Sequence, residues 1–169
     1  MAQARVIVVI GVAGSGKTTI GLALAERLGI EFVDGDGLHP PENVAKMTRG
    51  IPLDDADRLP WLERIGDWID SRLAAGSSGV VACSGLRRAY RQLIGEGRAG
   101  VQLVYLRVRR EVAEDRVSHR SGHFFGAALL ESQFAALEEP EPDEGVLTVN
   151  GEFSVPRVVD EIARGLTAA

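Results

Sequence analysis

The chain has 169 residues, of which 45% are apolar, and it carries a formal net charge of −5. Its length suits one domain, residues 1–169, with a substantial core, and its negative charge argues against a general attraction to nucleic acid or to an anionic membrane. Cys83 is the single cysteine, which excludes an internal disulfide and a cysteine-based metal cluster. No apolar stretch approaches membrane-spanning length, so we expect no membrane partner and a cytoplasmic protein.

Short β-branched apolar runs alternate with longer segments of helical periodicity, which is typical of a parallel sheet with helices on both faces. In chain order, strands are predicted over residues 6–10, 31–34, 79–83, 101–106 and 146–149. Helices are predicted over residues 17–28, 56–75, 88–95, 110–119, 127–137 and 155–166. The sequence therefore predicts the α/β fold class.

The segment 11–18 reads GVAGSGKT and directly follows the first predicted strand. Its glycines allow backbone conformations closed to other residues, so successive N–H groups can point at phosphate oxygens. Lys17 adds a charge for the outer phosphates of a nucleoside triphosphate, and Thr18 offers a hydroxyl to magnesium. The alternatives are a plain glycine turn and a dinucleotide fingerprint, but the latter needs the reverse glycine spacing. The predicted nucleotide-binding residues are Gly11, Gly14, Ser15, Gly16, Lys17, Thr18 and Thr19.

The second predicted strand ends in Asp34-Gly35-Asp36. Ligands of an open parallel sheet bind beyond the carboxyl ends of its strands, so these carboxylates are candidates for chemistry. Two carboxylates at alternating positions suit phosphoryl transfer to an alcohol, with one facing a metal ion and the other a hydroxyl group. The alternative is a turn followed by a helix cap, which is common for such residues.

The segment that follows, an insert of about residues 36–62, is rich in charge, proline and glycine and lacks a long apolar periodicity. This composition favours a ligand-facing insert, and an arginine within it would pair well with a carboxylate. Trp61 begins a pattern of helical spacing that is more typical of a core than of a binding surface. The candidate donors to a small polyhydroxy acid are His39, Lys46, Arg49 and Arg58.

Two further segments follow the third and fourth predicted strands. Ser84 to Arg88 follow the third strand, and residues 116–125 lie beyond the fourth. Arg116 and Arg120 are four residues apart, so a helix would place both on one face, where they could hold a transferring phosphoryl group. The alternative is a solvated basic face. Because Gly122 supplies a joint before His123, we predict a mobile lid over about residues 116–130.

Together these segments resemble the gluconate kinase (gluconokinase) family of small P-loop kinases. The resemblance covers residues 11–144 and includes the long insert, which is specific to that family, whereas the phosphate loop is shared by many nucleotide-binding proteins. The matching blocks are GVAGSGKT, DGDGLHPPENVAKMTRGIPLDDADRLPWL, CSGLRRAYR, GHFF and SQFAALEEPEPDE.

The resemblance implies a three-layer sandwich like that of nucleoside monophosphate kinases, with parallel strands in the order 2-3-1-4-5. It also implies transfer of the γ-phosphoryl group of ATP, with Mg²⁺, to the 6-hydroxyl of D-gluconate, which gives 6-phospho-D-gluconate and ADP. Family members can be dimers, so a homodimer is compatible with the resemblance.

The resemblance further assigns roles to single positions. Lys17, Asp36 and Arg120 match the catalytic set, with Asp36 as general base or orienting group. Thr18 and Asp34 match the metal site, and Arg116 with Arg120 falls in the lid over the phosphates. The residues around the sugar acid are Asp36, His39, Arg49, Arg58, Ser84, Arg87 and His123.

Two positions depart from the family pattern. Gly85 stands where alanine is usual, and Arg87 stands where lysine is usual. Arginine and lysine place their donors differently, so Arg87 could alter acceptor preference. Two other readings stay open: a kinase for another small acid such as shikimate, against which the insert argues, and a nucleotide-dependent switch. The guanine-reading Asn-Lys-x-Asp pattern of such switches is absent from the sequence.

Overall fold

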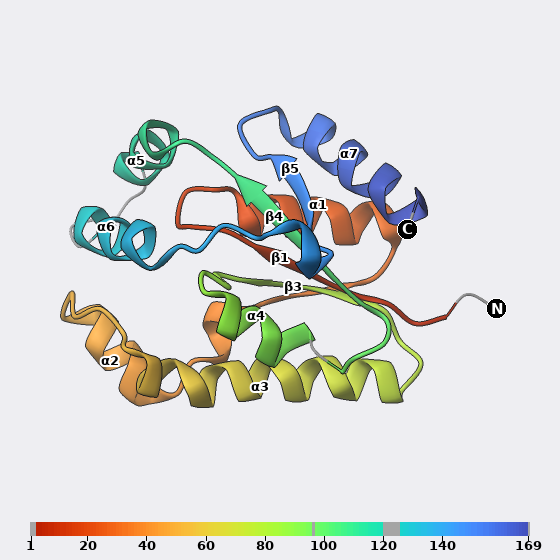
Figure 1. The fold of residues 1–169 in the computed structure, drawn as a ribbon, viewed down its shortest axis with the longest axis horizontal. Coiled ribbons are helices and arrows are strands. Elements are labelled where there is room, and N and C mark those ends of the chain that lie inside the picture. Colours follow the sequence, from red (N-terminus) through yellow and green to blue (C-terminus); the bar gives the residue numbers. More distant parts are fainter. Residues whose placement is uncertain (1–2, 96, 120–125, 169) are drawn as a thin grey trace.

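A single five-stranded parallel sheet organises the computed structural model, which describes residues 3–95, 97–119 and 126–168 (Figure 1). The order β2-β3-β1-β4-β5 confirms the predicted topology. Val8, at the centre of β1, pairs with Val81 on one side and with Leu103 on the other. The strands are β1 (Val6–Ile10), β2 (Glu31–Asp34), β3 (Gly79–Cys83), β4 (Val101–Arg107) and β5 (Leu147–Asn150).

The described helices include all six that the sequence predicts, with ends shifted by at most two residues. They are α1 (Lys17–Leu28), α2 (Pro41–Thr48), α3 (Asp55–Ala74), α4 (Arg88–Gly95), α5 (Arg110–Ser118), α6 (Gly126–Ala136) and α7 (Val155–Ala168). The sequence does not predict α2, because this helix is short and buries only Asn43, so it carries no apolar stripe. Within the described ranges, no helix has the length and apolar character needed to cross a membrane.

The helices form layers on the two faces of the sheet. In Figure 1, α1 and α7 lie above the strands, and α3 and α4 lie below them. Alternate residues of β1 serve the two layers: Ile7 and Val9 pack toward α1 and α7, whereas Val8 packs toward α3. Every residue of β1 is buried, as expected for the central strand of a parallel sheet.

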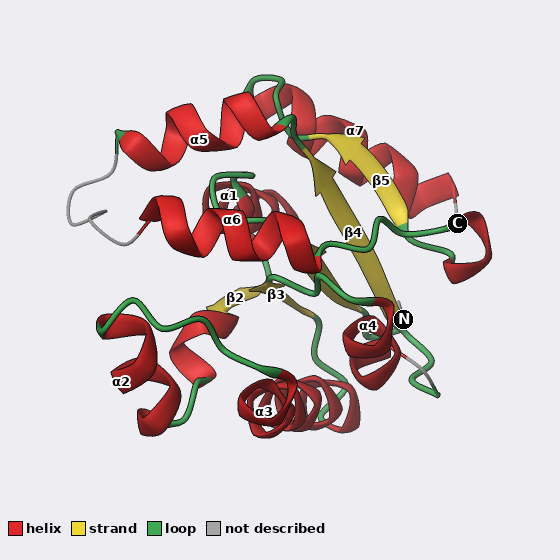
Figure 2. Ribbon diagram, turned by 60° about the vertical axis from the view of Figure 1, so that its left-hand side comes forward, coloured by secondary structure: helices red, strands yellow, loops and turns green. Residues whose placement is uncertain are grey.

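A third apolar cluster lies at the carboxyl ends of the strands and joins α5 and α6 to the loops there. Val12, Leu86 and Val108 come from the loops after β1, β3 and β4, and they pack with Val117 of α5 and Leu130 of α6. Figure 2 shows α5 and α6 side by side beyond this edge of the sheet. The predicted lid, about residues 116–130, begins at the end of α5 and runs into the start of α6, but residues 120–125 lie outside the described residues, so the lid stays a prediction.

Cys83 ends β3 in the core, where its side chain is 1% exposed. Burial raises the pKa of its thiol to about 12, so the reactive thiolate is scarce at neutral pH. We expect no reaction with an excess of a thiol-specific reagent in native buffer at pH 8, and stoichiometric reaction after unfolding in urea. Rapid, complete modification of the native protein would contradict this burial.

Candidate active site

The loop between β1 and α1 has the geometry of a phosphate-binding loop. Gly14 and Gly16 adopt φ values of +80° and +95°, which side chains rarely tolerate. A Cβ atom at Gly14 would lie 2.7 Å from the carbonyl oxygen of Ala113, so the loop packs tightly against α5. The first N–H groups of α1 have no partner within the helix and carry its positive dipole end. An anion fits at this helix start.

Ser15 adds an observation that the sequence alone does not supply. Its side chain is fully buried, yet its Oγ has no hydrogen-bond partner in the part of the chain that the structure describes. Such a group is costly unless a ligand or solvent satisfies it. Nearby, Lys17 Nζ donates to the carbonyl oxygen of Val12 at 3.0 Å, which folds this side chain back over the loop.

The two acids after β2 lie directly beside this loop. Thr18 Oγ1 donates to Asp34 Oδ2 at 3.3 Å, and Asp34 Oδ1 accepts from the Asp36 N–H at 2.9 Å. Asp34 thus caps the 3₁₀ turn Gly35–Leu38, so the turn-and-cap alternative is part of the structure and coexists with the contact to Thr18. A hydroxyl and a carboxylate are hard oxygen ligands of the kind that Mg²⁺ accepts beside phosphates. Among the described residues, no group of three or more His, Cys, Asp or Glu side chains could form an all-protein metal cage.

The core holds the Asp34–Asp36 turn in place. A Cβ atom at Gly35 would collide with the carbonyl oxygen of Ala82 in β3, so only glycine permits this approach. On the other side, Trp61 Nε1 donates to the Gly35 carbonyl at 2.7 Å. Trp61 itself is 1% exposed, which confirms the prediction that it belongs to the core.

His39 lies against the same tryptophan. Its imidazole stacks on Trp61 with ring centroids 4.3 Å apart and planes 13° from parallel. The side chain is 9% exposed, and Asn43 Nδ2 lies 3.1 Å from its Nδ1 atom. Burial, and then the charge of Arg58, lower the pKa of His39 to about 4, so the ring is neutral at pH 7.

Arg87 lies near the carboxylate of Asp55, and Arg58 is linked to the same carboxylate through Tyr90. Arg58 Nη1 donates to the hydroxyl of Tyr90 at 3.1 Å, and that hydroxyl donates to Asp55 Oδ1 in a short hydrogen bond. Arg87 Nε lies 3.9 Å from the same Asp55 oxygen. Burial, followed by the bond to Asp55, raises the pKa of Tyr90, so its hydroxyl stays protonated. Arg87 therefore lies near a carboxylate of the protein itself, and Arg58 is linked to the same carboxylate through the Tyr90 hydroxyl.

The remaining insert candidates differ in their contacts. Lys46 Nζ binds both carboxylate oxygens of Asp57 at 2.8 and 2.9 Å, so it braces α2 against α3. Arg49 follows the last residue of α2 and is exposed, with only backbone hydrogen bonds among the described residues.

Ser84 follows β3 and contacts the phosphate loop through its backbone. The carbonyl oxygen of Ser84 accepts from the Gly11 N–H at 3.1 Å, which ties the loop after β3 to the phosphate loop.

Arg116 reaches the phosphate loop from α5. Its guanidinium donates to the carbonyl oxygens of Gly14 at 3.1 Å and Gly151 at 3.0 Å. α5 ends at Ser118, so Arg116 lies in its last turn, and the expectation that one helix face carries both Arg116 and Arg120 stays a prediction. Arg120, Gly122 and His123 lie outside the described residues, and their predicted roles stay predictions.

Two contacts that support the site are missing from the sequence predictions. Gln133 Oε1 accepts from the Ala13 N–H at 2.6 Å, which joins α6 to the phosphate loop. Buried Arg91 donates to the carbonyl oxygens of Gly85 and Leu86 and forms an ion pair with Glu144 at 2.7 Å. Gln133 lies in the block SQFAALEEPEPDE and Arg91 in the block CSGLRRAYR. Sequence spacing alone does not reveal the long-range partners of these two side chains.

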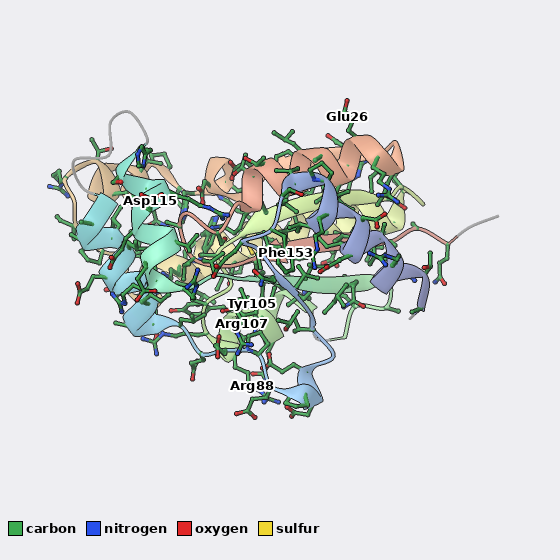
Figure 3. The ribbon with its side chains drawn as sticks, turned by 90° about the horizontal axis from the view of Figure 1, so that it is seen from above. Glu26, Arg88, Tyr105, Arg107, Asp115 and Phe153 are labelled. Carbon is green, nitrogen blue, oxygen red and sulfur yellow. The ribbon has the colours of Figure 1, made fainter. Side chains whose placement is uncertain are left out.

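A hollow of about 540 Å³ lies at the ends of β4 and β5. Its lining includes Arg107, Arg109, Glu139 and Glu152, and these form the pairs Arg107–Glu139 and Arg109–Glu152. Figure 3 shows Arg107 next to Tyr105 along β4. Among the described residues, the lining includes neither Lys17 nor Asp36, so the hollow is distinct from the site around them.

The low pKa of His39 predicts a pH-dependent stability. Between about 4 and the ordinary value of 6.5, the unfolded chain binds more protons at this position than the folded chain does. The free energy of unfolding therefore falls as the pH drops through this window, by about 1–3 kcal/mol from this one group after allowance for solvent screening. We expect His39→Gln to reduce that pH dependence in urea titrations at pH 7 and pH 4.5. Equal pH dependence in the two proteins would contradict the assignment.

Comparisons with known proteins agree over nearly the whole chain. A family model described as an AAA domain matches residues 6–140. The chain is 44% identical over 164 residues to a gluconokinase of Gluconobacter oxydans (strain 621H), covering 97% of this chain and 92% of that protein. A crystal structure of a sugar kinase from Janibacter sp. HTCC2649 is 43% identical with a TM-score of 0.90, covering 98% of this chain and 96% of that chain. A crystal structure of a gluconokinase from Sinorhizobium meliloti 1021 is 41% identical with a TM-score of 0.86, covering 99% and 94%.

Proposed function

The chain belongs to the gluconokinase family, and we propose that it transfers the γ-phosphoryl group of ATP to the 6-hydroxyl group of D-gluconate. The products are 6-phospho-D-gluconate and ADP. The observation that carries the proposal is the identity of 44% to a gluconokinase over 97% of the chain, in a fold that places Asp34 and Asp36 beside the phosphate loop. We place the reaction in the cytoplasm, where a lone thiol such as Cys83 stays reduced.

The phosphate side of the site is preorganised for negative charge. The loop from Gly11 to Gly16 and the start of α1 present N–H groups, and Lys17 supplies a mobile positive charge at the loop. The buried Ser15 hydroxyl supports the proposal because a phosphate oxygen would satisfy it. Arg116, anchored on the carbonyl oxygens of Gly14 and Gly151, closes this side of the loop from α5.

Thr18 and Asp34 are the residues that fit Mg²⁺. Their oxygens are 3.3 Å apart at the start of α1 and the end of β2. Mg²⁺ is commonly held by one or two protein oxygens together with phosphates and water, which matches this small donor set. When bound, the ion offsets the negative charge of the phosphates during transfer.

The acceptor side supplies a base and charge pairing. As the O6–P bond forms and the bond between the β,γ-bridging oxygen and phosphorus breaks, the electron pair leaves with ADP, and the hydroxyl proton passes to the carboxylate of Asp36. Arg87 lies near the Asp55 carboxylate, and Arg58 is linked to it through the Tyr90 hydroxyl, so both guanidinium groups are candidates to pair with the carboxylate of a sugar acid. This arrangement explains a preference for an acidic acceptor.

The first prediction of this proposal concerns acceptor dependence. We expect ADP release from MgATP to rise steeply with D-gluconate and to yield 6-phosphogluconate, while shikimate and gluconate epimers give little response. A coupled assay for ADP with product identification measures both quantities. ADP release that ignores every acceptor would overturn the acceptor assignment and leave only nucleotide hydrolysis.

The second prediction separates the two halves of the site. Asp36→Asn keeps the shape of the side chain but removes the base, so kcat should fall on the order of 10²-fold or more while ATP binding persists. Lys17→Ala serves as the comparison, because it should weaken both ATP binding and turnover. An Asp36→Asn enzyme with normal kcat would remove this carboxylate from the mechanism.

A further inference from the structure

Asn43 is the one buried residue of α2, and its amide nitrogen contacts two elements at once. The residue is only 3% exposed to solvent. Nδ2 donates to the carbonyl oxygen of Asp57 in α3 at 2.8 Å and lies 3.1 Å from Nδ1 of His39. A buried amide with both contacts on the same nitrogen constrains the proton position on the histidine.

The constraint follows from the chemistry of each group in turn. A backbone carbonyl oxygen only accepts hydrogen bonds, so the Asn43 atom that faces Asp57 is the amide nitrogen and not the amide oxygen. The same nitrogen then directs its second hydrogen at Nδ1 of His39. Two donors cannot face each other, so Nδ1 is the unprotonated ring nitrogen and the proton is on Nε2.

The surroundings keep the His39 imidazole neutral and hold its ring parallel to the Trp61 indole. Trp61 stacks on the ring, and the Trp61 N–H is itself anchored on the Gly35 carbonyl. Arg58 is the charged side chain that acts on the ring, and burial disfavours a second positive charge beside it. The Asp57 carboxylate does not offset this, because it pairs with Lys46.

We propose that Asn43 is a positioning residue that locks His39 as the Nε2–H tautomer, so that the imidazole offers a neutral hydrogen-bond donor to a hydroxyl oxygen of the acceptor. Within the described residues, no group accepts a hydrogen bond from Nε2. The role toward the acceptor rests on the proposed function, whereas the tautomer does not. A donor at this place favours an acceptor that carries an oxygen there and penalises a deoxy analogue.

The tautomer can be read directly in the full-length protein. In long-range ¹H–¹⁵N correlation spectra of ¹⁵N-labelled protein at pH 7, we expect His39 Nδ1 to show the shift of an unprotonated nitrogen and Nε2 that of a protonated one. The chain has three histidines, and the His39→Gln variant identifies the signal by its loss. A protonated Nδ1, or a charged ring at pH 7, would overturn the proposal whether or not the protein phosphorylates gluconate.

The positioning role is tested by reversing the donor. In Asn43→Asp a carboxylate faces Nδ1, which favours a proton on Nδ1 and turns Nε2 into an acceptor. We expect KM for gluconate to rise roughly tenfold, KM for ATP to stay unchanged, and the ring spectrum to switch. If this variant does not fold, Asn43→Ser, which shortens the donor, should give a mixture of tautomers and a smaller rise in KM.

Thr48→Ala is the matched control, because Thr48 lies on the same helix and its exposed hydroxyl binds only the Val44 carbonyl among the described residues. It should leave both KM values and the His39 spectrum unchanged. A switched tautomer in Asn43→Asp with an unchanged KM for gluconate would overturn the positioning role. Absence of gluconate phosphorylation in the wild type, with the expected tautomer, would instead contradict the proposed function.

Discussion

The hydrogen bond from the Trp61 indole to the Gly35 carbonyl joins the hydrophobic core to the chemistry of the site. Trp61 packs with Ile65 and the strands on one face of the sheet, so its position is set by apolar burial. Its N–H group then has one buried partner, and that partner is the turn between Asp34 and Asp36. Because a buried donor without a partner is costly, the core and the turn hold each other in place.

The same indole also contacts the side of the site where we propose that the acceptor binds. His39 stacks on its face, and Asn43 fixes the ring from α2. Side chains held on packed helices vary less in position than side chains on open loops. The insert, which by composition has the character of a loop, therefore acts as a rigid part of the site built on α2 and the start of α3.

The charged side chains of the proposed acceptor site are already paired within the protein. Arg58 donates to the Tyr90 hydroxyl, which in turn donates to Asp55, and Arg87 lies near the same carboxylate. Asp55 and Arg87 are well exposed, so their ion pair is weak and a substrate carboxylate could exchange with Asp55 at low cost. The phosphate side is held differently, by backbone contacts from Arg116, Gln133 and Ser84.

The sequence by itself determined the strands, six helices, the strand order through the family resemblance, and the positions of the glycine-rich loop and of the Asp34–Asp36 turn. These features depend on local periodicity and on motif spacing, both of which can be recognised in the sequence alone. It did not indicate α2, since a short polar helix leaves no apolar stripe, and it extended α5 beyond its end at Ser118. Only the tertiary structure decided that Trp61 anchors Gly35, that Asn43 orients His39, and that Gln133 and Arg91 brace the loops. Each of these contacts joins residues whose distance is set by packing of the layers, and their partners are fixed by the need to satisfy buried polar groups.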